Sequence, residues 1–557
     1  MTTDSPSVVP TTDGPTVVYR GRNLYSPATP ITACRRRVAA LTIPDHSLVL
    51  VPSPLLGHGL TDLLHKCGPG CRVLLVELEA PLAALARQRL PAALLDDSRV
   101  TFCAAERVQE LERCFPLELR SRCERVISVN LSAGSQLHSR EYTQLLHWLQ
   151  DEIRRAWQNR ITTIHMARLW FRNLIANLPL LPVSRPITGV AVERPVLVLG
   201  AGPSLEPLLA ELRRQRDQLF VMAVDTALPV LVAHGITVDA VVALEPQHAN
   251  LGDFLGVDCR APLLLADLFS YPAVVRLFTP HHTLFFASHP LDSRLIDKLQ
   301  AHGLMPLQIP PLGSVGVAAV KLATCIYGGP VAFAGLDFAY ADGKTHARGA
   351  PMLQRQHQTA RRLSGDRIYT ACLARPRLRQ PDKQGGRCQT DMVLLSYAEQ
   401  LRSLTTGSPR LYDLGVCGLP TGAPRLDGIA EFLRVAGTSQ IGAASGLSCR
   451  LRATSVSATT AASHAAARQQ TATVRAALDE QLSLLARIEE QVTNRAARDP
   501  QILSALLQAA DYLYAETSAP SAGDEASLRR MLAAARYYRI QIGRALRNLE
   551  RLTARRF

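Results

Sequence analysis

The stretch PVLVLGAGPSLEPLLAELRRQ, residues 195–215, decides the fold. It opens with an apolar run that predicts a buried strand, and the glycines Gly200 and Gly202 follow that run. Beyond Ser204, leucines recur at spacings of three and four residues, which predicts a helix with one apolar face. A strand that passes through a glycine turn into a helix is the repeating unit of a parallel α/β sheet.

The turn in this stretch has the features of a site for a phosphate or another anion. Gly200 and Gly202 let the backbone turn sharply and approach a ligand, and Ser204 is placed to cap the helix. The first N–H groups of the helix then face the crevice at the end of the strand, where open α/β sheets bind ligands. A purely structural use of the glycines is the alternative.

Short apolar segments alternate with helical ones through the middle of the chain, and they predict further strands of the same sheet. The predicted strands cover residues 195–200, 219–224, 239–244, 262–266, 283–287 and 330–335. Upstream, residues 47–79 show the order strand, glycine turn, helix, strand and acid, and 125–131 predict another strand. The upstream turn, PSPLLGHG, lacks the G-x-G-x-x-G spacing, so we expect a structural Rossmann-like domain there.

These patterns predict two Rossmann-like α/β domains with parallel sheets, N-terminal and central, followed by an α-helical C-terminal domain. The expected parts are a disordered tail at 1–18, the N-terminal domain at 19–140, a helical connector at 141–189, the central catalytic domain at 190–436, a linker at 437–462 and the helical domain at 463–557. We expect the helical domain to contribute to acceptor binding.

Two apolar stripes at helical spacing predict that the last helices pack as a bundle. One stripe comprises Val474, Leu478, Leu482, Leu485, Ile488 and Val492, and the other Leu528, Met531, Ala535, Tyr538, Ile542, Ala545, Leu549 and Leu552. The opposite face of the final helix forms a basic surface that suits a partner, with Arg529, Arg536, Arg539, Arg547 and Arg551.

Composition narrows the class of protein. The chain has 557 residues, 47% of them hydrophobic, and a formal net charge of +15, which fits a multidomain globular protein with a phosphate-bearing ligand or an acidic partner. The chain has no basic run interleaved with aromatic residues, so the sequence does not predict nucleic-acid binding. The 12 cysteines lack the spacing of a disulfide framework or a zinc site, so we expect buried reduced thiols. Without a long apolar run or a basic N-terminus, we expect no membrane span, no signal peptide and a cytoplasmic location.

Acidic residues follow two of the predicted strands. Asp225 and Glu245 should both lie at the edge of the sheet that carries the glycine turn, where they could bind a ribose or orient an acceptor. Alternatively, Asp225 caps the helix that begins at Thr226. Farther along, Ser314 and Gly316 precede a helix of small and apolar residues, which predicts a second helix N-terminus that presents N–H groups to an anion.

Chemically active side chains gather directly after the strand at 330–335. Asp337, Lys344 and His346 supply an acid, a cation and an imidazole, which are poor core material and good active-site material. Each alone could be a turn residue. Together they predict a catalytic centre at the same edge of the sheet.

These segments resemble the Maf (motility accessory factor) family of flagellin glycosyltransferases. The resemblance rests on GAGPSL, DTAL, GITVDAVVALEPQ, GSVG and GLDFAYADGKTHA, and it covers roughly residues 190–360. The central segment is similar in turn to bacterial sialyltransferases, whose donor loop reads G-x-G-P-S-L and whose late strand ends in G-x-D-F. The resemblance implies a protein O-glycosyltransferase that moves a nonulosonic acid, of the pseudaminic or legionaminic type, from a CMP-activated donor to Ser or Thr of flagellin. It thereby implies a role in flagellar assembly and motility.

The resemblance also assigns residues by position. It places Gly200, Gly202, Pro203 and Ser204 in the donor loop, Ser314 and Gly316 in a second nucleotide-contacting turn, and Asp337 at the acid after the late strand. Glu245 stands where the family pattern has Asp. The CMP-sugar is the donor substrate, no other cofactor is implied, and metal dependence and oligomeric state stay open.

The general base is not assigned by the resemblance, because similarity to the sialyltransferases fades beyond Tyr340. His346 and His357 are both candidates, and we expect His346 to remove the proton of the incoming hydroxyl. Lys344 or Arg348 would offset charge on the departing phosphate.

Two other functions remain as alternatives. Archaeal 6-hydroxymethylpterin diphosphokinases have a domain similar to this one, and there Asp225, Glu245 and Asp337 would hold Mg²⁺ with ATP. Large flanking domains favour a protein substrate over a small pterin. The other alternative is a non-catalytic flagellin-binding module, against which the intact glycine and Ser/Gly turns argue.

Overall fold

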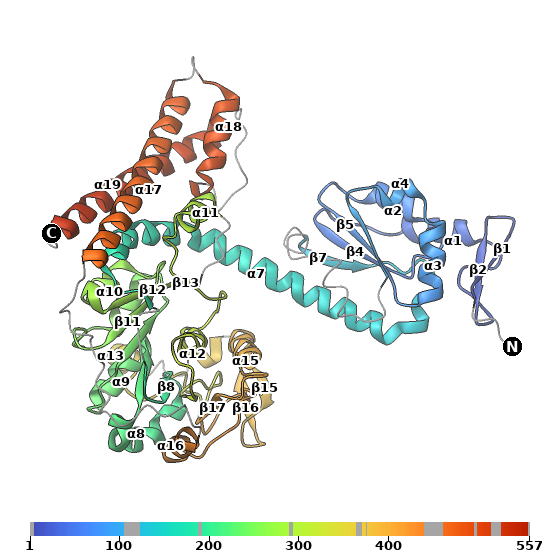
Figure 1. Ribbon diagram of the computed structural model, residues 1–557. Coiled ribbons are helices and arrows are strands. Elements are labelled where there is room, and N and C mark those ends of the chain that lie inside the picture. The colour runs from blue at the N-terminus through green and yellow to red at the C-terminus, as the bar shows by residue number, and fades with distance from the viewer. Residues whose placement is uncertain are drawn as a thin grey trace. The chain divides into compact units, whose positions relative to one another are not determined.

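The computed structural model describes residues 5–104, 123–187, 192–288, 293–363, 370–374, 376–438, 461–494, 498–513 and 525–554. The chain divides into two compact units, Met1–His165 and Met166–Phe557. The 39-residue helix α7 (Ser139–Asn177) begins in the first unit and ends in the second. Each unit contains a parallel sheet (Figure 1).

The first unit is built on a four-stranded sheet in the order β6-β5-β4-β7, with all neighbours parallel. Its strands are β4 (Ser47–Pro52), β5 (Arg72–Glu77), β6 (Val100–Ala104) and β7 (Arg125–Ser128). Its helices include α1 (Pro30–Ala39), α2 (Leu60–Lys66), α3 (Ala80–Arg89) and α4 (Ala92–Leu95). Every residue of β4 is buried, as expected for an apolar run in a parallel sheet that is covered on both faces. The predicted βαβ order is confirmed.

Residues 5–18 correct the expectation of a disordered tail at 1–18, of which residues 1–4 lie outside the described residues. β1 (Ser7–Val9) pairs antiparallel with β2 (Thr16–Tyr19), which pairs in turn with β3 (Arg22–Asn23). Val17 and Tyr19 are buried in the core that covers one face of the four-stranded sheet. Pairing and burial of TVVY therefore outweigh the Pro-rich and Thr-rich composition that suggested disorder.

The second unit contains an eight-stranded parallel sheet in the order β13-β12-β11-β10-β9-β8-β14-β17. The strands are β8 (Val196–Leu199), β9 (Phe220–Val224), β10 (Ala240–Ala243), β11 (Leu263–Asp267), β12 (Thr283–Ala287), β13 (Leu307–Gln308), β14 (Val331–Ala334) and β17 (Leu411–Asp413). All six predicted strands are present. The sequence missed β13 and β17, because strands of two and three residues give no periodic signal, and it missed the hairpin of β15 (Leu378–Pro381) and β16 (Arg387–Thr390).

Alternate residues of the central strands face two different cores. In β10, Val242 belongs to the core with α12 (Val315–Ile326), which packs against β8, β9 and β14. Val241 and Ala243 belong to the other core. Other helices of this unit are α8 (Leu209–Gln215), α9 (Leu228–Ala233), α10 (Pro272–Val275), α11 (Arg294–Ala301), α13 (Pro351–Thr359), α14 (Thr370–Ala374), α15 (Met392–Thr405) and α16 (Ile429–Thr438).

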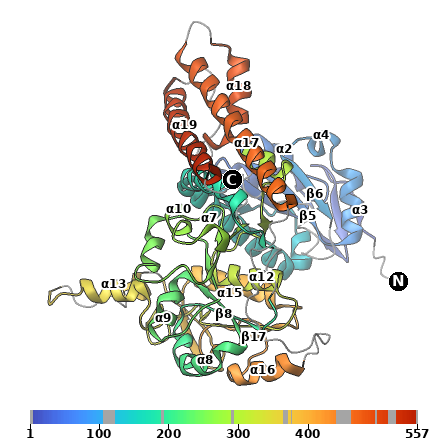
Figure 2. The ribbon, with the colours of Figure 1, turned by 60° about the vertical axis from the view of Figure 1, so that its left-hand side comes forward.

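The C-terminal helices are α17 (Ala461–Thr493), α18 (Pro500–Ala509) and α19 (Glu525–Ala554). Both predicted apolar stripes face inward, although Leu482 and Leu552 are only partly buried. The same core contains residues of β10, β11 and β12 and of the last turns of α7. The helices therefore share one core with the central sheet, and do not form the self-contained domain that was expected at 463–557. Figures 1 and 2 show them at one end of this unit, with α8 and α16 at the other.

Two further expectations concern the segments between these parts. α7 confirms the helical pattern of the connector, with Leu145, Leu149 and Ile153 buried, and Trp157 lies among residues whose side chains are not described. Most of the predicted linker at 437–462 lies outside the described residues, since α16 ends at Thr438 and α17 begins at Ala461.

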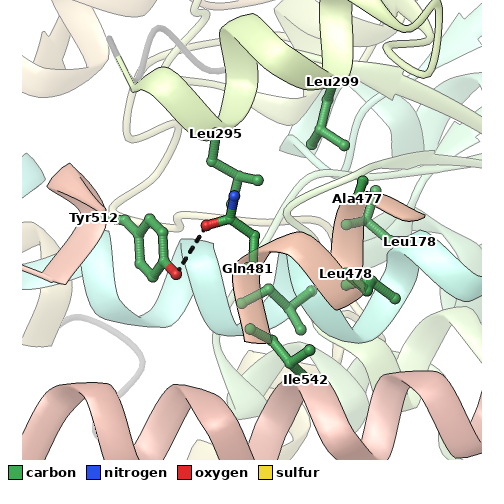
Figure 3. Close-up of a pocket in the computed structure, with 9 residues that line it drawn as sticks. Leu178, Leu295, Leu299, Ala477, Leu478, Gln481, Tyr512 and Ile542 are labelled. Atoms are coloured by element: carbon green, nitrogen blue, oxygen red, sulfur yellow. Dashed lines mark hydrogen bonds between the residues drawn. The ribbon is translucent and has the colours of Figure 1, made fainter. Parts of the chain in front are cut away.

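A cavity of about 10 Å³ lies in the shared core, between α11, α17, α19 and the segment that follows α7 (Figure 3). Aliphatic side chains dominate its lining, and the two polar members satisfy each other: Tyr512 Oη donates to Gln481 Oε1 at 3.1 Å. Burial raises the pKa of the Tyr512 hydroxyl, so it stays protonated and able to donate. The cavity is at the lower limit for one water molecule, which shows how closely the helices pack on the sheet.

The cysteines in the described part of the chain are free, and most are buried as predicted, although Cys325 is exposed. Among the described helices, none has both the length and the apolar character that a membrane crossing requires.

Candidate functional site

The candidate site lies at the point where the strand order of the central sheet reverses. Strands β9 to β13 follow one another on one side of β8, and β14 and β17 lie on the other side of β8. In open α/β sheets, ligands bind at such a switch point, in the crevice outside the carboxyl ends of the two central strands. The turn after β8 carries Gly200, Gly202 and Ser204, and the turn after β14 carries Asp337, so the sequence-predicted residues meet at this point.

Glycines allow these two turns to touch through their backbones. Gly200 N–H donates to Ala334 O, and Gly202 N–H donates to Gly335 O, each at 2.8 Å. A side chain at Gly200 would collide with the backbone of Gly335, and a Cβ at Gly202 would lie 2.6 Å from Asp337 Oδ2 and 2.7 Å from Gly335 O. Gly335 itself has φ +70°, which a residue with a side chain rarely adopts. The glycines are thus needed for contact between the turns, whether or not a ligand also approaches them.

Ser204 joins the two turns by its side chain. Its N–H donates to Asp337 Oδ2 at 2.8 Å, its Oγ hydrogen-bonds to Asp337 Oδ1, and that Oγ also accepts from Gly335 N–H at 3.1 Å. Ser204 is buried, and it lies inside the 3₁₀ segment η5 (Pro203–Leu208), whose N-cap is Gly202. The expectation that Ser204 caps the helix is therefore wrong, because Gly202 holds the N-cap position and the Ser204 hydroxyl bonds to the buried carboxylate of Asp337.

Lys383 and Asp413 extend this network, and sequence reasoning missed both. Lys383 Nζ lies 2.8 Å from Asp413 Oδ2, and both side chains are almost fully buried. Among the described residues Lys383 Nζ has this ion pair but no hydrogen-bond acceptor, so the ammonium keeps N–H groups unused. Asp413 Oδ2 also accepts from Thr421 Oγ1 at 2.8 Å. Burial raises the pKa of Asp337, and the positive charge of Lys383 opposes that shift.

The backbone is strained directly after Asp337. Phe338 has φ 50°, a left-handed conformation that costs free energy for a bulky residue. Gly418, at φ +100°, packs against the backbone of Asp337, and Leu419 N–H donates to Asp337 O at 2.8 Å. The strained turn is thus held from a second direction, by the segment that follows β17.

The loop after this turn crosses back over the glycine turn. Ala347 N–H donates to Ala201 O at 2.7 Å, and Arg348 N–H donates to Glu206 Oε1 at 2.8 Å. Lys344 Nζ lies 3.9 Å from Glu206 Oε1, and its side chain remains about a third exposed. The structure therefore brings Lys344 to the glycine turn, as the sequence predicted.

His346 lies in the same loop and is partly buried. Its Nδ1 lies 2.9 Å from Thr345 Oγ1, and burial lowers the pKa of the imidazole from its usual value of 6.5. A lowered pKa keeps the ring neutral at neutral pH, which a proton acceptor requires. The other candidate, His357, is exposed near the end of α13.

Ser314 and Gly316 form the predicted start of α12. Ser314 is the N-cap, and its Oγ accepts from Gly316 N–H at 3.2 Å. A side chain at Gly316 would collide with Leu336 of the turn after β14, so this helix start lies against the same turn as Gly200.

Asp225 and Glu245 belong to a neighbouring cluster after β9 and β10. Asp225 is buried, and its carboxylate accepts from Thr226 N–H at 2.8 Å and from Asn250 Nδ2 at 2.7 Å. Burial and then the charge of Asp253 raise the pKa of Asp225 to about 7. Glu245 is exposed as a residue, and partial desolvation together with the charge of Asp253 raises the pKa of its carboxyl group. Asp225 thus supports the loop after β9, and Glu245 is the more accessible acid.

The two clusters do not merge into one metal site. In the part of the chain that the structure describes, no group of three or more His, Cys, Asp or Glu side chains is arranged for a metal ion. Asp337 instead bonds to Ser204, and Asp225 to Asn250. In these contacts the carboxylates of Asp337 and Asp225 each accept hydrogen bonds from neutral donors.

Comparison with known proteins identifies relatives. Over 423 residues the chain is 32% identical to an uncharacterized protein of Treponema pallidum (strain Nichols), which spans 74% of this chain and 73% of that protein. The chain belongs to the family of this treponemal protein. Another uncharacterized protein of the same organism is 34% identical over 88 residues, 16% of this chain and 42% of its own length.

Two further matches concern the central segment and the fold. Residues 172–343 match the family described as 6-hydroxymethylpterin diphosphokinase MptE-like. The solved structure of the Maf glycosyltransferase from Magnetospirillum magneticum AMB-1 aligns with a TM-score of 0.54 at 16% sequence identity, over 98% of this chain and 89% of that one. The predicted resemblance to Maf proteins is thus confirmed in the fold, and the similarity to sialyltransferases stays a prediction.

Proposed function

We propose that this protein is a glycosyltransferase whose nucleotide-sugar donor binds at the switch point between β8 and β14. The observation that carries the proposal is the contact between the glycine turn after β8 and the Asp337 turn after β14, with Lys344 and His346 in the loop that crosses them. A likeness of the fold to a Maf glycosyltransferase supports it.

The proposed donor is a CMP-activated nonulosonic acid, of the pseudaminic or legionaminic type. Its phosphate would lie near the backbone N–H groups at the start of α12 and near Lys344, which is partly exposed and held only loosely by Glu206. Positive charge and fixed N–H dipoles stabilise negative charge that develops on the departing CMP. Gly200, Gly202 and Pro203 would form the floor of this site, and Ser204 and Asp337 would hold the floor in shape.

In the proposed reaction, His346 accepts the proton of a Ser or Thr hydroxyl. The hydroxyl oxygen forms a bond to the anomeric carbon of the sugar, the bond from that carbon to the phosphate oxygen breaks, and CMP leaves with the electron pair. Nδ1–H of His346 can donate to Thr345 Oγ1, which leaves Nε2 as the proton acceptor. The lowered pKa of the imidazole fits this role.

The proposed acceptor is flagellin, modified in the cytoplasm before export, so that loss of the enzyme impairs flagellar assembly and motility. The basic residues of α19 lie on the unit that contains the donor site, which supports an acidic or polar protein acceptor. The proposed reaction is open to a divalent metal but does not depend on one; among the described residues no group of three or more His, Cys, Asp or Glu side chains is arranged for a metal ion.

The first experiment is a thermal-shift titration of the full chain with CMP, CDP, UDP, ADP and ATP, each with and without Mg²⁺. A ligand that binds only the folded protein raises its melting temperature. We expect CMP to stabilise the protein more than the other nucleotides. Stabilisation by no nucleotide would contradict the proposal and favour a non-catalytic binding module.

Matched variants then separate chemistry from binding. His346→Ala should slow sugar transfer to flagellin by about 10²- to 10⁴-fold while leaving the CMP shift intact. His357→Ala serves as the control that keeps transfer. Transfer at wild-type rate by His346→Ala would remove this histidine from the mechanism.

A second candidate is an ATP-dependent diphosphokinase that acts on a pterin. The family match at residues 172–343 favours it, and Asp225, Asp253 and Glu245 provide acids near one another after β9 and β10. Stabilisation only by ATP with Mg²⁺ in the titration above would place this candidate first.

A further inference from the structure

A second pocket lies in the same compact unit, away from the switch point. It has a volume of about 760 Å³ and is formed by the last turns of α7, by α10 and its flanks, and by one face of α19. Figure 2 shows α7 and α10 side by side below α19. Its volume falls within the range of about 300–1,000 Å³ that is typical of small-molecule sites.

Five arginines line this pocket, and no acidic residue does. They are Arg172 of α7, Arg276 directly after α10, and Arg544, Arg547 and Arg551 of α19. The three from α19 follow one another at spacings of three and four residues, so they project from one face of the helix. Five positive charges gathered without a counter-charge repel one another, and an anion in the pocket would relieve that repulsion.

The acids of α19 do not neutralise these arginines. Glu550 accepts from Arg475 Nη1 at 3.1 Å, and Glu525 accepts from Arg498 Nη1 at 2.7 Å, so both pair with helices or turns outside the pocket. Arg172 donates to its neighbour Asn173. With the residues that the structure describes, Arg276, Arg544, Arg547 and Arg551 form no side-chain hydrogen bond or ion pair.

The basic face of α19 therefore has two parts. Arg536 and Arg539 pair with Glu489 of α17 and tie the two helices together. Arg544, Arg547 and Arg551 lie farther along and face the pocket. The first part is structural, and the second remains available to a ligand.

We propose that this pocket binds a small soluble ligand that carries two or more phosphate groups. Guanidinium groups bind phosphate oxygens in bidentate geometry, and several of them around one cavity match a diphosphate better than a single charge. Tyr271 and Tyr537 line the same pocket, and their rings can pack against a base or sugar attached to the phosphates. This site shares no residue with the switch point. Arg547 and Arg551 also belong to the basic face of α19 that was considered above for the acceptor, and the poly-glutamate measurement below distinguishes the two uses.

The test measures binding of inorganic pyrophosphate, inorganic phosphate and ADP to the full chain by calorimetry. Arg276→Gln combined with Arg547→Gln should weaken pyrophosphate binding at least tenfold. Arg529→Gln combined with Arg530→Gln is the matched control, since both are exposed on α19, outside the pocket, and the change in net charge is the same. We expect the control to bind pyrophosphate within about twofold of wild type.

Several results would overturn the proposal. Equal loss in the control would mean that pyrophosphate responds only to net charge. Loss of pyrophosphate binding in Ser204→Ala, with Arg276→Gln and Arg547→Gln unaffected, would place the anion at the switch point. Binding of a poly-glutamate peptide with no binding of pyrophosphate would assign the arginines to a protein partner. Should the double variant melt well below wild type, Arg276→Lys with Arg547→Lys keeps the charge, and it should still lose affinity because lysine cannot bind in bidentate fashion.

Discussion

Replacement of Ser204 by alanine tests whether one hydroxyl holds the two turns of the site together. The substitution removes the hydrogen bond between Oγ and Asp337 Oδ1, and it leaves Gly335 N–H without its acceptor, 3.1 Å away in the wild type. A hydrogen bond to a charged group contributes about 1.5–3 kcal/mol, and an unsatisfied buried N–H costs about 1–3 kcal/mol. Because the two effects overlap, we expect Ser204→Ala to destabilise the protein by about 4 kcal/mol.

For a cooperative unit of several hundred residues, a loss of this size lowers the melting temperature by about 5 °C. Differential scanning calorimetry of the full chain measures it without any assumption about the substrate. Ser403→Ala removes the same atom from an exposed position on α15, where its Oγ donates to Glu399 O at 3.0 Å, and should change stability by less than about 0.5 kcal/mol. Equal melting temperatures for both variants would refute the role of Ser204 as the link between the turns.

Three further predictions concern titration and charge. Burial and the charge of Asp253 raise the pKa of Asp225 to about 7, so the folded protein keeps a proton that the unfolded chain loses near pH 3.8. The free energy of unfolding should therefore fall as pH rises from about 4 to about 7. Asp225→Asn should flatten that fall in thermal melts taken across this range. The lowered pKa of His346 places the acid limb of the transfer rate below pH 6.5, and His346→Ala should lose that limb together with about 10²- to 10⁴-fold in rate, as a pH–rate profile would show. Lys383→Met leaves the Asp413 carboxylate buried without its counter-charge and should cost about 3–5 kcal/mol in denaturant melts, whereas the additional change Asp413→Leu should recover part of that loss.

The sequence was sufficient for most of the fold because local signals were strong. The strands from β8 to β12 and β14 are continuous apolar runs, and they are buried on both faces as parallel strands require. The stripes of α17 and α19 were equally clear. The prediction of strands failed for β13 and β17, which are too short to give a periodic pattern. It also failed for β1 and β2, because a composition rich in Pro and Thr suggested disorder although these strands pair.

The site was predicted in outline but not in its bonding. Position after a strand placed Ser204, Asp337, Lys344 and His346 at one edge, and the structure agrees. The orientation of the Ser204 side chain depends on its hydrogen bonds to Asp337, which lies 133 residues away in sequence, and no local pattern predicts that pairing. Lys383 was missed for the same reason, because it lies in a turn between β15 and β16 with no periodic context. Asp413, an acidic residue at the end of β17, was a signal in the sequence that could have indicated this part of the site.

The shared core of the second unit bears on how the protein is made. One face of β10, β11 and β12 is covered by helices that include the final one, α19. During synthesis, the N-terminal unit can fold as soon as it emerges, because its sheet is complete by Ser128. The central sheet leaves the ribosome long before α19, and until then an apolar face built around residues such as Leu264 and Phe285 is only partly covered. α19 therefore completes the cover of the central sheet, and a chain that stops short of α19 should be recognised by chaperones and proteases.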